Sequence, residues 1–151
     1  MISIYDAPGA AAALTAATPK TVIAVTAPAQ FGVNWMGYEI SFDGSTSTAT
    51  PALIELCTFT AATAGTNTAV TIVNDAGQRV TTGFTAGTNY TVEPTVLAAF
   101  KTFYQPQYGG LVVVQFTPGQ EPDSAVSQGF AIRVTSTATV NCRASIKFSR
   151  C

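Results

Sequence analysis

The residues that could carry out chemistry are few in this sequence, and they do not form a complete catalytic set. The chain has 151 residues and contains no histidine, which removes the commonest general base and the commonest zinc ligand. Nucleophilic systems that pair serine or cysteine with histidine are therefore excluded. We expect a protein that is not an enzyme and that uses no cofactor and no metal.

The acidic residues do not suggest a glycosidase or a calcium site. Glu121 and Asp123 are a close pair in a loop that also contains proline and serine. A glycosidase needs two carboxylates across a cleft about 5–10 Å wide, and calcium needs about six or more oxygen ligands. We expect a solvated loop here. Asp43 and Asp75 stand beside turn glycines, where their side chains are expected to cap turns.

The three cysteines, Cys57, Cys142 and Cys151, are widely spaced and odd in number. This pattern fits neither a disulfide framework nor a zinc site with closely spaced ligand pairs. Cys57 and Cys142 lie among alternating apolar residues and are expected to be small buried side chains. Cys151 is expected to be a free thiol, and a reducing compartment is favoured.

The aromatic residues have two interpretations, a sugar-stacking surface and a packed core. Trp35 and Tyr38 lie on or beside a strong strand pattern, which favours burial. Tyr90 adds to the possible stacking set. Tyr104 and Tyr108 flank an expected loop, where a protein interface and simple anchoring of the loop are equally compatible with the sequence.

Composition disfavours nucleic-acid binding and gives no sign of a membrane span. Only 10% of the residues are charged, and the formal net charge is -1. The seven basic residues are scattered from Lys20 to Arg150, whereas a nucleic-acid binder clusters them on one face. No apolar stretch reaches the ~18 residues of a membrane span. Such a low charge indicates a surface that faces other protein, or one coated with threonine and serine.

Alternation of apolar and polar residues predicts a series of short strands. In residues 35–43, Met36, Tyr38, Ile40 and Phe42 are expected on one face. The strands predicted along the chain span 21–28, 35–43, 52–60, 69–73, 111–116, 130–135 and 140–148. Strands of this length at this spacing predict an all-β fold, an antiparallel β-sandwich of jelly-roll or Ig-like type.

Three segments have more specific expectations. Residues 130–148 read as an antiparallel hairpin, and the continuous apolar run at 111–116 reads as a buried strand. Residues 94–104 carry apolar residues three to four apart, which suits one short helix, while the β-branched and aromatic residues among them are also compatible with a strand.

The domain boundaries follow from the start of the strand pattern. Residues 20–151 are expected to form a single sandwich domain, and residues 1–19 an extended N-terminal arm that can reach a neighbour. The residues expected to contact a partner are Met1, Ile2, Ile4, Tyr5, Tyr104 and Tyr108.

Two blocks, GYEISFDG at 37–44 and PALIELC at 51–57, resemble small head-associated proteins encoded with the capsid genes of tailed bacteriophages. Further similar blocks follow in the same order, and the resemblance covers residues 36–148. These further blocks are YTVEPT at 90–95, YQPQ at 104–107, PGQEP at 118–122, AIRVT at 131–135 and VNCRA at 140–144.

The resemblance implies a capsid decoration, or cement, protein. Such a protein lies on the capsid exterior of the virion, is assembled in the host cytoplasm, and clamps neighbouring subunits of the major capsid protein, often as a homotrimer. The alternatives are a tail-tube or head-fibre component and, from another class, a carbohydrate-binding module. For decoration, we expect that deleting the first ~19 residues weakens capsid binding without unfolding the sandwich.

Overall fold

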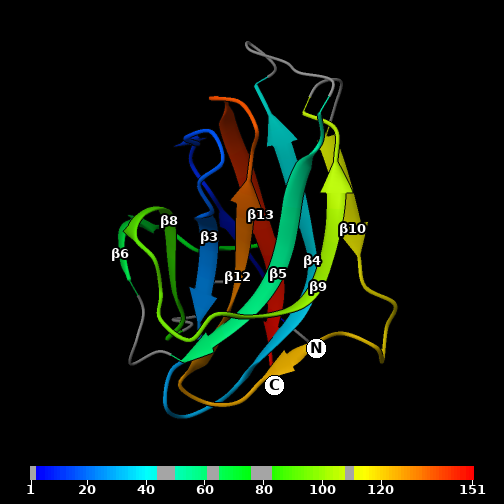
Figure 1. Ribbon diagram of the computed structural model, residues 1–151. Helices are drawn as coiled ribbons and strands as arrows, with labels where there is room; N and C mark the ends of the chain where they lie inside the picture. Colours follow the sequence, from blue (N-terminus) through cyan, green and yellow to red (C-terminus); the bar gives the residue numbers. More distant parts are fainter. Residues whose placement is uncertain (1–2, 44–49, 61–64, 76–82, 108–110) are drawn as a thin grey trace.

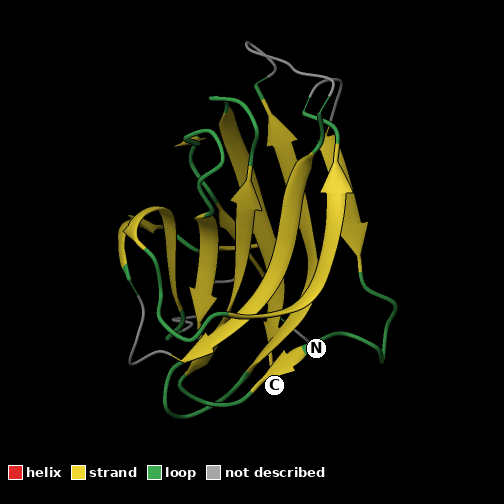
Figure 2. Ribbon diagram, viewed as in Figure 1, coloured by secondary structure: helices red, strands yellow, loops and turns green. Residues whose placement is uncertain are grey.

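The computed structural model describes residues 3–43, 50–60, 65–75, 83–107 and 111–151. These residues form two antiparallel sheets that pack face to face, with no helix among them (Figures 1 and 2). The prediction of an all-β, antiparallel sandwich is therefore confirmed. The described part of the chain accordingly holds no helix long and apolar enough to cross a membrane.

Each sheet is built from strands that are mostly distant in the sequence. The first sheet contains, in order, β10 (Leu111–Gln115), β4 (Val33–Phe42), β13 (Asn141–Arg150), β1 (Ile4–Pro8) and β7 (Val73–Asn74), while β11 (Asp123–Ser124) also pairs with β4 and β2 (Ala12–Ala13) with β13. The second sheet contains, in order, β6 (Thr66–Val70), β8 (Thr85–Val92), β3 (Lys20–Thr26), β12 (Gln128–Thr135), β5 (Ala52–Thr60) and β9 (Ala98–Gln105).

The core between the sheets is centred on Trp35, which is fully buried. Its ring lies 4.9 Å from that of Phe130 and 5.9 Å from that of Tyr38, measured between ring centroids. The indole Nε1 donates a hydrogen bond of 2.9 Å to the carbonyl of Gly37, so the polar atom of this large side chain is satisfied. The expected burial of Trp35 and Tyr38 is confirmed.

A bulge in β4 changes which of its side chains face the core. Opposite β13, Gly37 pairs with Lys147 and Trp35 with Phe148, so Met36 is the extra residue. An extra residue shifts the alternation by one, and Trp35 and Tyr38 therefore both point inward. The expectation that Met36 shares the buried face is wrong, since this residue is partly exposed.

The last two long strands do not form the expected hairpin. β12 lies in the second sheet between β3 and β5, whereas β13 lies in the first sheet beside β4. The connection bends tightly at Ser136, whose hydroxyl donates to the carbonyl of Ala138 (2.7 Å) and accepts from its N–H (3.1 Å). Alternation identified both strands correctly but carries no information on the strand with which each one pairs.

The expected N-terminal arm is extended, but from Ile4 it forms part of the first sheet. β1 lies between β13 and β7, and Tyr5 and Ala7 on its inner side are buried. Ala12 and Leu14 are also fully buried. β1 joins the sheet because β13 pairs with β4 on one side only, and the backbone groups on its other side need hydrogen-bond partners, which β1 supplies. Deletion of residues 1–19 would therefore remove part of the core.

The short helix expected at 94–104 is a strand over most of its length. β9 pairs with β5, and the register of this pairing shifts at Phe100. Phe100 and Phe103 both reach the aromatic core, where their rings lie 6.1 Å from Trp35 and 6.2 Å from Tyr38. A bulge thus gives two inward side chains three residues apart, a spacing that resembles the period of a helix.

Candidate protein-interaction surface

The residues expected to contact a partner have very different environments in the structure. Tyr104 is 72% exposed, whereas Tyr5 is 3% exposed and Ile4 is half-buried. Tyr104 belongs to β9 rather than to a loop. Met1, Ile2 and Tyr108 lie outside the described residues. Tyr104 is therefore the candidate that the structure presents most openly.

Tyr104 belongs to one of two edge strands whose own residues are mostly apolar. β9 and β10 are edge strands of different sheets and run along the same side of the molecule (Figure 1); we call these two strands the β9–β10 side. Lys101 is their one charged residue. The large apolar side chains exposed on the β9–β10 side are Phe100 (45%), Tyr104 (72%), Leu111 (58%) and Val113 (59%).

The exposure of β10 differs from the prediction. The apolar run at 111–116 predicts a buried strand, but Leu111 and Val113 are exposed because β10 lies at the edge of its sheet. The apolar run itself is the sequence signal for this surface, but such a run predicts a buried strand equally well. A run of four apolar residues on an open edge is typical of a surface that is covered by another chain.

Packed aromatic rings support the β9–β10 side from within. Phe116, which follows β10, lies 5.9 Å from Trp35 in an edge-to-face arrangement and 6.0 Å from Tyr38. Phe103 of β9 stacks on Tyr38. Such contacts hold the ring positions fixed. A rigid surface loses little conformational entropy when a partner binds to it.

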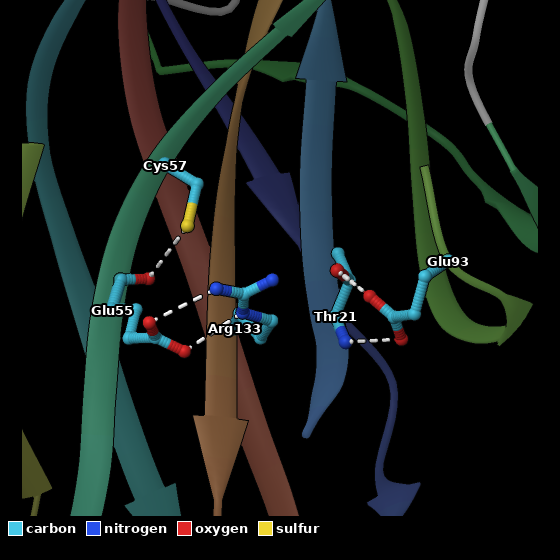
Figure 3. Close-up of polar contacts among 5 residues, drawn as sticks. All are labelled: Thr21, Glu55, Cys57, Glu93 and Arg133. Atoms are coloured by element: carbon cyan, nitrogen blue, oxygen red, sulfur yellow. Dashed lines mark hydrogen bonds and ion pairs between the residues drawn. The ribbon is translucent and has the colours of Figure 1, made fainter. Parts of the chain in front are cut away.

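The outer face of the second sheet carries the strongest polar contacts, and they are internal (Figure 3). The Arg133 guanidinium binds the Glu55 carboxylate through two hydrogen bonds, Nε to Oε2 at 2.7 Å and Nη2 to Oε1 at 2.9 Å. This carboxylate raises the pKa of Arg133. Glu93 accepts from the backbone N–H of Thr21 at 2.8 Å and from its hydroxyl. These groups therefore join neighbouring segments of the second sheet.

A short connection crosses the outer face of the second sheet from β8 to β9 (Figure 1). We call residues 93–97 the strap. Glu93 fixes its start to β3, and Leu97 packs on a small apolar cluster near its end. Val96 has a φ of 57°, in the left-handed region, which is unfavourable for a β-branched residue. The members of the apolar cluster are Ala24, Cys57, Phe59, Tyr90 and Ala131.

The cysteines have the environments that the sequence predicts. Cys57 and Cys142 are buried free thiols, and Cys151 is an exposed free thiol. Burial raises the pKa of Cys57 to about 11 and that of Cys142 to about 12. Because the thiolate is the reactive form, neither buried sulfur is a competent nucleophile near neutral pH.

The outer face of the first sheet has two small hollows with both charged and apolar residues in their linings. One of about 220 Å³ is lined by Asp6, Glu39 and Arg143 among others, and one of about 170 Å³ by Asp75 and Lys147 among others. Both are smaller than the roughly 300–1,000 Å³ of typical small-molecule sites. Within the described ranges, no group of three or more acidic or cysteine residues could hold a metal ion.

The acidic residues singled out in the sequence are used in local contacts. Glu121 accepts a hydrogen bond of 2.6 Å from the N–H of Gly119, and Asp123 lies in β11 beside β4. Asp43 accepts from the Asn141 amide at 2.7 Å. Asp75 forms an ion pair of 3.2 Å with Lys147. The side chains of Glu121, Asp43 and Asp75 therefore bind neighbouring parts of the chain.

Comparison with known proteins gives no relative: no family model, no curated protein and no solved structure matches the chain.

Proposed function

We propose that this protein is a structural protein of a bacteriophage virion that binds the outer capsid surface and stabilises contacts between major capsid subunits. The observation that carries the proposal is the exposure of large apolar side chains on the two edge strands, Phe100 and Tyr104 on β9 and Leu111 and Val113 on β10. The link to a capsid rests on the sequence blocks that resemble phage head proteins.

The structural argument concerns the kind of partner. Interfaces between proteins are depleted in charge at their centre and enriched in aromatic residues. Tyr104 and Phe100 provide such residues on a rigid strand, and Lys101 between them supplies one polar contact at the rim. Truncation of large aromatic residues at the centre of an interface commonly costs about 2 kcal/mol or more of binding free energy.

Binding to capsids tests the proposal directly. Particles that lack the protein are mixed with the purified chain, and the bound fraction is measured by co-sedimentation. We expect saturable binding that is weakened about 30-fold or more by Tyr104→Ala. The control is Val73→Ala, which changes a side chain that is 45% exposed on β7, at the opposite edge of the first sheet.

Three results would contradict the proposal. If the purified chain does not bind capsids, decoration is wrong. If the chain alone assembles into stacked rings or fibres in negative-stain images, a tail-tube or head-fibre role is favoured over decoration. If Tyr104→Ala and Val73→Ala bind as well as the original chain, the β9–β10 side is not the contact.

A further inference from the structure

The open edges of the two sheets differ in how well they are protected against pairing with another chain. Natural sandwiches protect edge strands with bulges, charges or very short strands. In the described part of the chain, β9 has a bulge and carries Lys101, β6 has an irregular register between Thr66 and Thr68, and β7 has two residues. β10 has none of these features.

β10 is a regular strand with a strong tendency to pair. Its five residues, LVVVQ, contain no charge, no proline and no glycine, and three of them are β-branched valines that favour strands. The register against β4 runs without a shift from Leu111 to Gln115. Among the described residues, no strand pairs with β10 on its other side. This edge is therefore the one left open.

The backbone groups that face the open side can be identified from one hydrogen bond. The N–H of Phe116 donates to the carbonyl of Met36 in β4 at 2.9 Å. Residues of an antiparallel strand alternate between facing the partner strand and facing away, so Val112 and Val114 also face β4. The residues that turn their N–H and C=O toward the open side are Leu111, Val113 and Gln115.

We propose that β10 pairs in antiparallel fashion with β10 of a second copy of this chain, around a twofold axis at Val113. In this register Val113 lies opposite Val113 of the second copy, and Leu111 lies opposite Gln115. All three outward-facing residues then exchange both of their backbone hydrogen bonds with the second copy. If the twofold axis lay at any other residue of β10, at least one of the five residues would have no partner in the second copy.

Charge favours a second copy as the occupant. β10 offers no charged side chain to attract a charged segment, whereas an identical strand meets it without any like-charge contact. The nearest acid on the neighbouring strand is Glu39, which pairs with Val113. Three strand spacings would separate it from Glu39 of the second copy, about 14 Å. Charges that far apart at the surface are largely screened at physiological salt.

The pairing would join the two first sheets into one continuous sheet. Because the twofold axis is perpendicular to that sheet, both second sheets lie on the same face of it. Tyr104 pairs with Leu53 of β5 and is exposed, so it remains accessible in both copies for a capsid. Both copies use the same edge strand for the contact, so the assembly is complete as a dimer.

Self-association of the full chain, without capsids, tests this inference. Sedimentation velocity and light scattering should give the mass of a dimer that dissociates on dilution. Val113→Lys should weaken association more than about tenfold, since it places two ammonium groups opposite each other. Val113→Glu should do the same, and an equimolar mixture of the two variants should restore the dimer. Val92→Lys, at a site on β8 that is 57% exposed, is the control.

Amide exchange distinguishes strand pairing from other dimers and needs no variant. The outward-facing amides of Leu111, Val113 and Gln115 should exchange more slowly as the concentration of the original chain rises. The amides of Val112 and Val114, bonded to β4, should be protected at every concentration.

A monomer or a trimer at all concentrations would overturn the inference, as would a dimer whose outward-facing amides exchange freely. Failure of the mixed variants to restore association, with both folded by circular dichroism, would also overturn it. These measurements use no capsid, so their failure would leave the proposed function standing.

Discussion

Replacing Tyr5 by alanine tests whether the N-terminal strand is part of the folded body. Tyr5 is 3% exposed, and its ring lies 5.6 Å from Phe148 and 6.2 Å from Phe84. Removing a fully packed aromatic ring from a core costs about 3–5 kcal/mol. A domain of this kind has about 5–15 kcal/mol of stability in total. We therefore expect Tyr5→Ala to lose a large share of the free energy of unfolding.

Urea unfolding followed by tryptophan fluorescence measures this loss, because the single tryptophan, Trp35, is fully buried. The matched control is Tyr104→Ala, the same chemical change at a residue that is 72% exposed. We expect the control to change stability by no more than about 0.5 kcal/mol. If both variants unfold at the same urea concentration as the original chain, β1 is a loosely attached arm and the reasoning is wrong.

Three other predictions concern strain, pH and thiol reactivity. Val96→Asn should raise the free energy of unfolding by about 1 kcal/mol, because asparagine tolerates the left-handed backbone better than valine; a lower urea midpoint would contradict this. Burial, and then the charge of Asp75, raise the pKa of the Asp6 carboxyl above its ordinary value of 3.8. The folded state therefore binds the carboxyl proton more tightly than the unfolded state does, and the protein loses stability as the pH rises from 3.8 through the pKa of the folded state. Asp6→Asn should remove this loss and be the more stable variant at neutral pH, as thermal unfolding at pH 3 to 7 can check. Ellman's reagent should label Cys151 rapidly in the native protein, and Cys57 and Cys142 only after unfolding; rapid labelling that persists in Cys151→Ser would count against their burial.

Alternation predicted the strands whose pattern is long and regular. β5 and β13 follow their predicted ranges closely because their strand patterns extend over nine and ten residues, respectively. β1 has only five residues, IYDAP, and such a short pattern before an alanine-rich segment gives no clear period. β9 was not predicted because its bulge at Phe100 places inward-facing apolar residues three positions apart, which is the spacing expected of a helix.

The candidate surface could be predicted only in part. The sequence predicts Tyr104 as a contact residue, but it does not distinguish the exposed ring of Tyr104 from the partly buried ring of Phe103 beside it. The valines of β10 indicate burial equally well in a central strand and in an edge strand covered by another chain. Which of these applies depends on the strand order, and strand order is set by contacts far apart in the sequence.

A cryo-EM map of the particle from which this chain comes tests the central claim most directly. The account predicts density for the sandwich on the outer capsid shell, between major capsid subunits, with Tyr104 directed toward them. Density for the sandwich inside the tail, or on the shell with the β9–β10 side facing only solvent, would contradict the account.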